Sequence, residues 1–340
     1  MAMQRSRVSS RDVARAAGVS PNTVSLVVRD SPLVAPATKA RVQQEIARLG
    51  YRPHAAAAAL RSTRSRTLGF LVAEVKEAVH DVFRHQLLSA ITTSAQAADH
   101  YLLVDTFVDA QRCAMLLNSG RIDGAVIDWV IGDDVLTDLV ARGAPVVLAG
   151  RDAGDLPVSW VKADEEGGAY RAGRHLVDLG HRRLALLTAG EADNAVVVAR
   201  LRGYGRALAE AGLSVGREYT GHGDWTFESG QQLGRQLLAR APRPTAVFVL
   251  NELMAVGLLR AADELGLRVP ADLTIATVED NPWVEYVRPP LTAAHIPMHD
   301  VGRRATEALL ALLADPASPP RQIVLPATFT VRGSSAPPAG

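Results

Sequence analysis

The chain has 340 residues, more than one typical domain, and 48% of them are hydrophobic, which is enough for two or three domains with a sizeable core. Its single cysteine, Cys113, excludes an intrachain disulfide and a cysteine-based metal cluster and fits a reducing compartment. No apolar run reaches the length of a membrane span and no export signal is evident, so we expect a cytoplasmic protein that does not contact a membrane.

Charge is distributed unevenly along the chain. Residues 1–66 carry twelve lysines and arginines but only three acidic residues, a net charge of +9, whereas the remainder has 25 basic and 33 acidic residues, a net charge of −8. A basic head on an acidic body is typical of a nucleic-acid-binding module joined to a second kind of domain. We therefore expect duplex DNA as the partner of the head.

The sequence of residues 9–28 predicts a helix-turn-helix. Ser9 or Ser10 can cap a first helix, which Gly18 ends by supplying the backbone freedom of a tight turn. Ser20 can cap a second helix, with Pro21 at its first position, where a missing N–H costs nothing. A generic helical subdomain is the alternative, and the excess positive charge weighs against it.

The second helix has two distinct faces. At 100° per residue, Val24, Val27 and Val28 share one face and are expected to pack on the first helix. The opposite face is free to enter a major groove, where asparagine can pair with adenine. That face carries Asn22, Ser25, Leu26 and Arg29.

A third helix and an alanine-rich hinge complete the head. The third helix begins near Pro36 and ends at Gly50, with Val42, Ile46 and Leu49 as its buried stripe. Residues 54–60 favour a helix by propensity, yet so short a helix is marginal alone, so we expect it to order only with a partner. Within it Leu60 either packs on the body or wedges between base steps in a minor groove.

From Thr67 onward the pattern changes to apolar runs alternating with segments of helical length. The runs read TLGFLVA, YLLVDTF, IDGAVID, APVVLA, RRLALLT, TAVFVL and DLTIATV. This alternation predicts an α/β fold of parallel sheets with helices on both faces, and the strands are too many for one core. We expect two α/β lobes with a ligand cleft between them, beyond the carboxyl ends of the strands.

The body shows none of the common catalytic or cofactor motifs. No P-loop, no G-x-G-x-x-G after the first strand, no HExxH and no G-x-S-x-G occurs, and no two histidines have metal-binding spacing. We therefore expect no catalytic residue, cofactor or metal. His181, in the sequence LGHRR, is most simply a turn residue that packs by its polar tip.

Several motifs in a fixed order resemble the LacI/GalR family of bacterial transcription regulators along nearly the whole chain. They are DVARAAGVSPNTVS, ARLGYRP, EEGGAYRAGRHLVDLGHRRLALL, RLRGYGRAL, GDWTFESG, LNELMAVGLLRAADELGLRVPADLTI and PPLTAAHIPMHDVGRRA. The resemblance implies a helix-turn-helix head at residues 1–53, a hinge helix and linker at 54–66, and a type I periplasmic-binding-protein-like effector domain at 67–332. Its first lobe would comprise about residues 67–163 and 293–321 and its second about 164–292 and 322–332, with a disordered tail at 333–340.

The resemblance also implies DNA contacts, made by a homodimer on a pseudo-palindromic operator. It favours the minor-groove wedge for Leu60. Leu26 stands where the family most often has a base-reading arginine, so we expect an altered half-site. The expected DNA-contacting residues are Ser10, Ser20, Pro21, Asn22, Thr23, Ser25, Leu26, Arg29, Tyr51, His54, Ala57, Leu60 and Arg61.

Residues matching the family's effector site are assigned position by position. Arg200 matches an effector-binding arginine, Trp225 a stacking aromatic, and Asn251 the asparagine of an Asn-Asp pair in which Glu252 here replaces the aspartate. His80 and Asp128 belong to the first-lobe side, Asp128 at the cleft mouth, and Glu279 replaces the first aspartate of a Gly-x-Asp-Asp stretch. Each also has a structural reading: Trp225 as core, Asp128 as a helix cap, Arg200 as the partner of a surface acid.

The sequence therefore predicts a transcriptional regulator, a repressor, controlled by a small polar effector that resembles a sugar. The chain ends without leucine heptads, which favours a dimer over a coiled-coil tetramer. The alternatives are a solute-binding protein and a sugar or nucleoside enzyme using Asp128 and Glu279 as an acid–base pair across the cleft.

Overall fold

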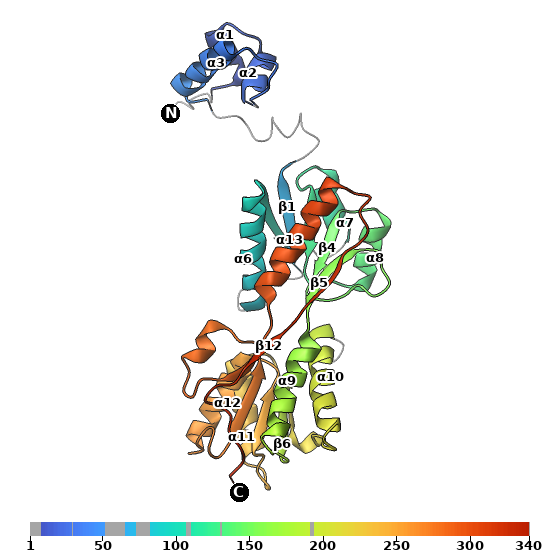
Figure 1. Cartoon of the computed structure of the whole chain (residues 1–340), viewed down its shortest axis with the longest axis vertical. Coiled ribbons are helices and arrows are strands. Elements are labelled where there is room, and N and C mark those ends of the chain that lie inside the picture. Colours follow the sequence, from blue (N-terminus) through green and yellow to red (C-terminus); the bar gives the residue numbers. More distant parts are fainter. Residues whose placement is uncertain are drawn as a thin grey trace, which may run out of the picture. The chain divides into compact units, whose positions relative to one another are not determined.

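A computed structural model of the chain divides into two compact units, residues 1–66 and 67–340, here called the head and the body (Figure 1). The model describes residues 8–28, 30–51, 65–72, 82–106, 110–129, 131–190 and 194–339. Among the helices in these ranges, none is both long and apolar enough to cross a membrane.

The head contains the three predicted helices, α1 (Ser10–Ala17), α2 (Pro21–Val28) and α3 (Pro36–Leu49). Ser9 caps α1, and its hydroxyl and backbone exchange hydrogen bonds with Asp12 in a capping box. Gly18 and Gly50 end α1 and α3 in the left-handed conformation that favours glycine. Ala35 precedes α3 without a side-chain cap, a position where serine or threonine would add about 1 kcal/mol.

Valine side chains form the centre of the head, with one exception to the prediction. Val24 and Val27 are buried against Val13 and Val42, so α2 packs on α1 and α3 as expected. Val28 is 41% exposed although Val27, in the same turn of α2, is buried, so the buried face of this helix includes Val24 and Val27 but not Val28. The prediction that Val28 packs on the first helix is therefore wrong.

The body contains two six-stranded sheets, as the alternating pattern predicted. In the first sheet the strand order is β11-β5-β4-β3-β1-β2, and every pairing is parallel. In the second it is β12-β10-β9-β8-β6-β7, where β12 alone runs antiparallel to its neighbour. The strands span β1 (Thr67–Val72), β2 (Tyr101–Thr106), β3 (Gly124–Ile127), β4 (Val146–Ala149), β5 (Ser159–Ala163), β6 (Leu184–Ala189), β7 (Thr220–Gly223), β8 (Ala246–Val249), β9 (Thr274–Val278), β10 (Thr292–His295), β11 (Gln322–Leu325) and β12 (Thr328–Thr330).

Helices cover both faces of each sheet. In the first lobe α6 and α13 pack together on one face, and α7 and α8 contribute to a separate core on the other. In the second lobe α9 and α10 pair on one face and α11 and α12 on the other (Figure 1). The helices span α6 (Val82–Ala97), α7 (Ala110–Asn118), α8 (Asp133–Ala141), α9 (Glu165–Asp178), α10 (Ala195–Ala209), α11 (Phe227–Leu238), α12 (Glu252–Glu264) and α13 (Met298–Ala314), with short 3-10 turns η1 (Arg217–Tyr219) and η2 (Pro282–Glu285).

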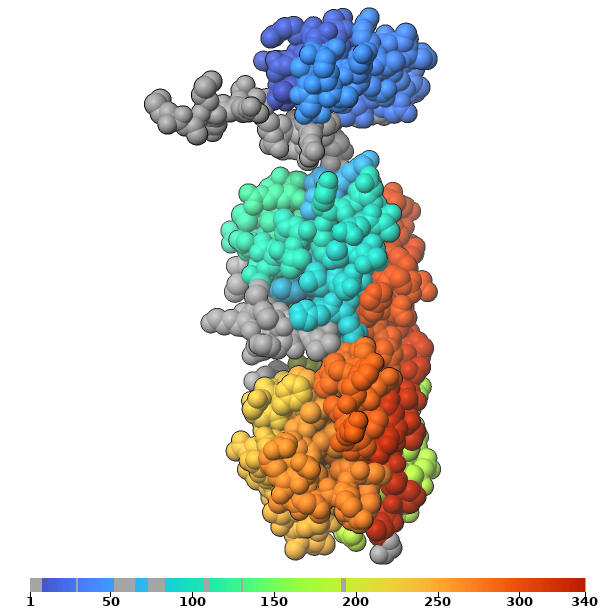
Figure 2. All heavy atoms as spheres, turned by 90° about the vertical axis from the view of Figure 1, so that its left-hand side faces the viewer, coloured from blue at the N-terminus to red at the C-terminus, as the bar shows by residue number. Residues whose placement is uncertain are grey.

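The chain crosses between lobes three times, and two crossings differ from the prediction. The first falls between Ala163 and Asp164, as expected. However, β10 (Thr292–His295) belongs to the second sheet and β11 (Gln322–Leu325) to the first, so the predicted boundaries at 293 and 322 are each placed about one strand too early. Figure 2 shows α13 in orange-red along the first lobe and the red C-terminal residues along the second.

Residues 333–339, predicted as part of a disordered tail, pack on the second lobe. The Ser334 side chain is fully buried, where its hydroxyl donates to the Ile275 carbonyl at 2.7 Å and accepts from the Thr292 N–H at 2.8 Å. His181 is buried as well, and its two ring nitrogens lie 2.9 Å from the Thr245 hydroxyl and 2.9 Å from the Ala336 carbonyl. These residues therefore pack against the starts of the central strands β9 and β10, and the prediction of disorder is wrong for them.

Replacing Ser334 with alanine tests this role. The change leaves a buried N–H and a buried carbonyl without their partner, so we expect a loss of about 1–3 kcal/mol in the free energy of unfolding, measured by urea denaturation. Ser214→Ala, at an exposed position, is the matched control and should change stability little. Equal stability of the two variants would show that the tail does not support the fold.

Candidate functional site

The polar surface of α2 is partly occupied by its own capping contacts. The Ser20 hydroxyl accepts the Thr23 backbone N–H at 3.0 Å and lies 2.9 Å from the Thr23 hydroxyl, so the predicted cap is present. Asn22 is exposed, as the groove-facing prediction requires. Pro21 is exposed beside it and Ser25 is half-buried. Asn22 is therefore the most accessible of the described polar side chains on this face.

Two predicted DNA contacts also serve the head's core. Leu26 and Tyr51 are half-buried and pack against the cluster that contains Val24 and Val27. The side chain at position 26 therefore contributes to the packing of the head as well as to the proposed DNA-contacting surface. Ser10, the first residue of α1, is half-buried beside the Ser9 cap.

Six predicted site residues lie outside the described part of the chain. They are Arg29, His54, Ala57, Leu60 and Arg61 among the expected DNA contacts, and His80 among the expected effector contacts. The expectations for the hinge at 54–60 fall in the same undescribed part.

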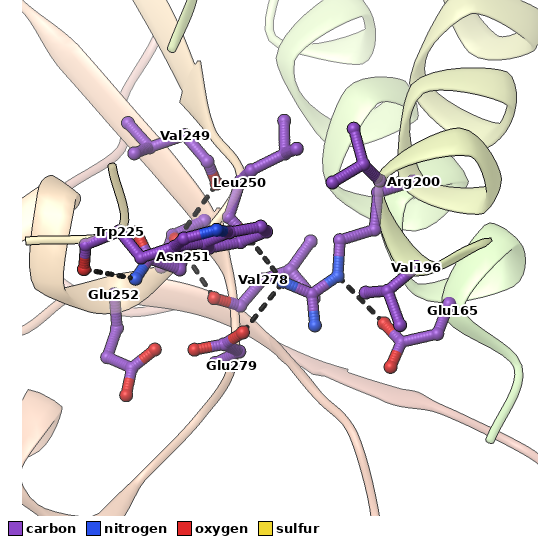
Figure 3. A network of polar contacts seen from close by, with 12 residues as sticks. Glu165, Val196, Arg200, Trp225, Val249, Leu250, Asn251, Glu252, Val278 and Glu279 are labelled. Atoms are coloured by element: carbon purple, nitrogen blue, oxygen red, sulfur yellow. Dashed lines mark hydrogen bonds and ion pairs between the residues drawn. The ribbon is translucent and has the colours of Figure 1, made fainter. Parts of the chain in front are cut away.

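In the body, Arg200 is the centre of a buried polar network. It extends from α10 and is only 1% exposed. Its Nε donates to Glu165 at 2.8 Å, and its Nη1 donates to Glu279 at 2.7 Å and to the Leu250 carbonyl at 2.6 Å (Figure 3). Burial alone would lower the pKa of Arg200, but the two carboxylates raise it, so the guanidinium stays charged.

Glu279 has both a shifted pKa and a strained backbone conformation. It follows β9 and is buried, which raises its pKa well above the usual value. The facing carboxyl of Glu252 raises this pKa further, while Arg200 opposes the shift. Its φ angle of 79° lies in the left-handed region, which is costly for a residue with a side chain. Such strain persists only where the surroundings hold it.

Trp225 lies at the edge of the same network. Its φ is 70°, and a Cβ on Gly190 would lie 2.9 Å from the indole, so only glycine permits this approach. The Asn251 amide donates to the Trp225 carbonyl at 3.0 Å, and its oxygen accepts the Met254 N–H to cap α12. Trp225 is half-buried, so part of the indole stays accessible. Asn251 thus positions Trp225 and begins the helix that carries Glu252.

Two residues that sequence reasoning missed connect the lobes. Gln86, on α6 of the first lobe, donates to Asn281 at 2.5 Å, and Asn281, beside η2 of the second lobe, donates to Glu252 at 2.5 Å. The Phe83 ring also lies 5.5 Å from the Arg200 guanidinium. We call the set Glu165, Arg200, Trp225, Asn251, Glu252, Glu279 and Asn281, with Phe83 and Gln86 opposite, the interlobe site. Glu165 lies in the sequence EEGGAYRAG, which resembles the family, but only the fold shows that it faces Arg200.

Asp128 lies at the strand end where the cleft was predicted, but its carboxylate is already paired within the first lobe. It follows β3 at the carboxyl end of the first sheet, is fully buried, and pairs with Arg84 at 2.9 Å. Arg84 in turn stacks on Trp129, 5.2 Å from the ring centroid. The N-cap position of α8, the next helix, is occupied by Gly132 rather than by Asp128. Its observed role is to hold Arg84 against Trp129.

The head and the body of this chain both match known families of bacterial proteins. A family model described as bacterial regulatory proteins, lacI family, matches residues 11–54, and a periplasmic binding protein-like domain matches residues 174–335. The transcriptional regulator CelR of Thermobifida fusca is 32% identical over 97% of this chain and 99% of its own. Catabolite control protein A of Priestia megaterium is 33% identical over 89% of this chain and 91% of its own.

Solved structures agree over nearly the full length. A lac repressor dimer bound to operator and the anti-inducer ONPF has a TM-score of 0.86 at 28% identity, covering 97% of this chain and 99% of that one. A complex of CelR with cellobiose has a TM-score of 0.71 at 31% identity, covering 96% and 100%. The fold of the head and of both lobes is therefore shared with these regulators.

The raised pKa of Glu279 predicts how stability varies with pH. Above about 4.5, the ordinary glutamate value, the unfolded chain releases this proton while the folded chain keeps it, so stability falls as pH rises toward the folded pKa. Glu279→Gln cannot titrate, so its stability relative to the unaltered chain should rise with pH, by up to about 1.4 kcal/mol per pH unit in that window, whatever the fixed effect of the substitution on the pairing with Arg200. Urea denaturation from pH 5 to pH 8 measures the difference.

Glu264→Gln is the matched control for Glu279→Gln. Glu264 lies exposed on α12, and Arg235 lowers its pKa, so its contribution has the opposite pH dependence. A constant stability difference between Glu279→Gln and the unaltered chain across this range would contradict the prediction.

Proposed function

This chain belongs to the lacI family of bacterial regulatory proteins, and from that premise we propose that it is a repressor controlled by a small polar, sugar-like effector. The observation that carries the proposal is the pairing of a helix-turn-helix head with an interlobe site. The head has a net charge of +9 and exposes Asn22 on α2. The body presents a half-buried indole beside buried carboxyl, amide and guanidinium groups, which suits a polar ligand with one apolar face.

The head supplies the DNA-binding part of the proposed function. We infer that it binds a pseudo-palindromic operator in the cytoplasm as part of a homodimer, because a two-fold protein matches a two-fold site. The lac repressor structure to which this chain is similar is a dimer on its operator. Positive charge on the head would contact phosphates, while α2 would read bases.

The interlobe site supplies the control part of the proposed function. Gln86 of the first lobe and Asn281 of the second are joined by a hydrogen bond, and Asn281 is bonded in turn to Glu252. A ligand that displaces or strengthens these contacts would change the angle between the lobes. The two hinges of a dimer would then change their separation, so effector and operator affinities would be reciprocally coupled, typically by 1–3 kcal/mol. The similar CelR structure holds cellobiose.

An enzymatic role has less support than regulation. The acid–base pair that such a role would use, Asp128 and Glu279, is bound internally to Arg84 and Arg200 respectively. The similar proteins are transcriptional regulators rather than enzymes or transport proteins. We therefore propose that the chain catalyses no reaction and needs no cofactor.

Removal of residues 1–60 tests the assignment of DNA binding to the head. The full chain should bind operator DNA with an affinity that falls steeply with salt, because each neutralised phosphate releases counterions. The shortened chain should lose this binding and keep ligand binding, which fluorescence anisotropy and calorimetry measure in parallel. DNA binding that is insensitive to salt, or that survives the removal, would refute the proposal.

Leu26→Arg tests the altered half-site. Leucine can pack on a thymine methyl, whereas arginine can donate two hydrogen bonds to guanine, a preference of about 1–3 kcal/mol. Selection of binding sites from random DNA should therefore recover a guanine at one position of each half-site in the variant only. Leu33→Arg, at a residue 83% exposed and outside α2, is the control and should leave the selected sequence unchanged. An identical sequence for Leu26→Arg would contradict the prediction.

A further inference from the structure

Carboxyl groups outnumber cations in the second-lobe part of the interlobe site. Among the residues that the structure describes there, Glu165 and Glu279 bind one guanidinium, that of Arg200, and a third carboxyl, that of Glu252, lies beside Glu279. All four side chains are at least nine-tenths buried. Burial makes uncompensated negative charge unfavourable, so this arrangement is stabilised by any group that brings positive charge or a proton.

Most of the donors of Arg200 are already engaged. Its Nε and Nη1 donate to two carboxyl groups and a carbonyl, which leaves Nη2, without a bonded acceptor among the described residues, as the part of the guanidinium open to a ligand hydroxyl. The Asn251 amide group donates to Trp225, and its oxygen accepts from Met254. What the described residues offer to a ligand is therefore mainly hydrogen-bond acceptors.

One of these acceptors has no fixed donor. Glu252 is 1% exposed, and its Oε1 accepts from Asn281, whereas its Oε2 is buried and, among the described residues, only a proton held by Glu279 can serve it. The group it faces is the carboxyl of Glu279, as the close-up suggests (Figure 3). A buried carboxyl oxygen without a donor costs free energy, and two facing carboxyls can be relieved by a shared proton or by a bound cation.

Figure 3 draws the Trp225 side chain in the same network as these carboxyls. Trp225 is held by the Asn251 amide and by close packing on Gly190, and its indole is half-buried. An indole face attracts an ammonium group through its quadrupole, and a carboxylate attracts the same group through charge and hydrogen bonds. A site with both is better matched to a cation than to a neutral hydroxyl, and it repels anions.

We propose that the interlobe site recognises an effector that bears a primary ammonium group on a sugar-like ring, with Glu252 and Glu279 as its acceptors. This inference rests on the proposed function, since it names the chemical class of the effector. The ammonium donates to the facing oxygens of the two carboxyls and takes the place of a shared proton, while the ring packs on Trp225. Because Asn281 links Glu252 to Gln86, occupation of this position is transmitted to the contact between the lobes.

Matched pairs of sugars test the proposal on the full chain. Isothermal titration calorimetry at pH 7 compares glucosamine with glucose, galactosamine with galactose, mannosamine with mannose, and the glucosamine disaccharide with cellobiose; glucose 6-phosphate serves as the anionic probe. At least one amine should bind tenfold or more tightly than its hydroxyl counterpart, and the phosphate should not bind. Preference for the hydroxyl members, tight binding of the phosphate, or no binding by any amine overturns the inference.

Two variants assign the preference to particular carboxyls. Glu252→Gln keeps an oxygen to accept from Asn281 but removes one negative charge, so it should abolish the amine preference. Its thermal stability should equal or exceed that of the unaltered chain, because the repulsion with Glu279 is gone, and this separates lost recognition from lost folding. Glu264→Gln, on the same helix but exposed, should retain the preference. Retention of the preference by Glu252→Gln would overturn the assignment.

The same titrations, repeated with operator DNA, separate this inference from the proposed function. A neutral sugar that binds and changes operator affinity would leave the proposed function standing while this inference fails. An amine that binds as expected to a chain that does not bind DNA would support the ligand class and refute the repressor role.

Discussion

The arrangement of the second lobe at the interlobe site depends on the hydrogen bonds of the buried Arg200 guanidinium. Because Arg200 is only 1% exposed, protein acceptors must replace water around its charge, and three elements supply them. Glu165 comes from the first turn of α9, Glu279 from the end of β9, and the Leu250 carbonyl from the end of β8. Removing either carboxylate would leave a buried charge less well compensated, so the three elements are tied together by one side chain.

Two strained residues lie near this network, and only one of them is held by Arg200. Glu279 and Trp225 both have left-handed backbone angles, which cost free energy for residues with side chains. Glu279 is held by Arg200, and Trp225 is held by Asn251 and by its approach to Gly190. Strain held in place by surrounding contacts, at the edge where two lobes meet, is what a ligand-responsive site requires, because binding can redistribute it.

The head follows simpler rules, and sequence reasoning was correspondingly more accurate there. Local signals determine its helices: the Ser9 and Ser20 caps, the glycine stops and the two-valine seam of α2. The error at Val28 arose because the apolar stripe of α2 is wider than its buried face, which includes Val24 and Val27 but not Val28. Periodicity also predicted Leu26 on the groove-facing side without showing that it packs against the core as well.

The sequence by itself determined the helix-turn-helix head, the two α/β lobes and most of the residues that gather where the lobes meet, because caps, apolar periodicity and motif order are local properties of the chain. Tertiary structure alone decided which of those residues neutralise one another: Arg200 with Glu165 and Glu279, and Asp128 with Arg84. It also decided that the last residues are ordered and that β10 and β11 belong to different lobes. Strand partners and buried ion pairs join positions far apart in the chain, so no local pattern specifies them.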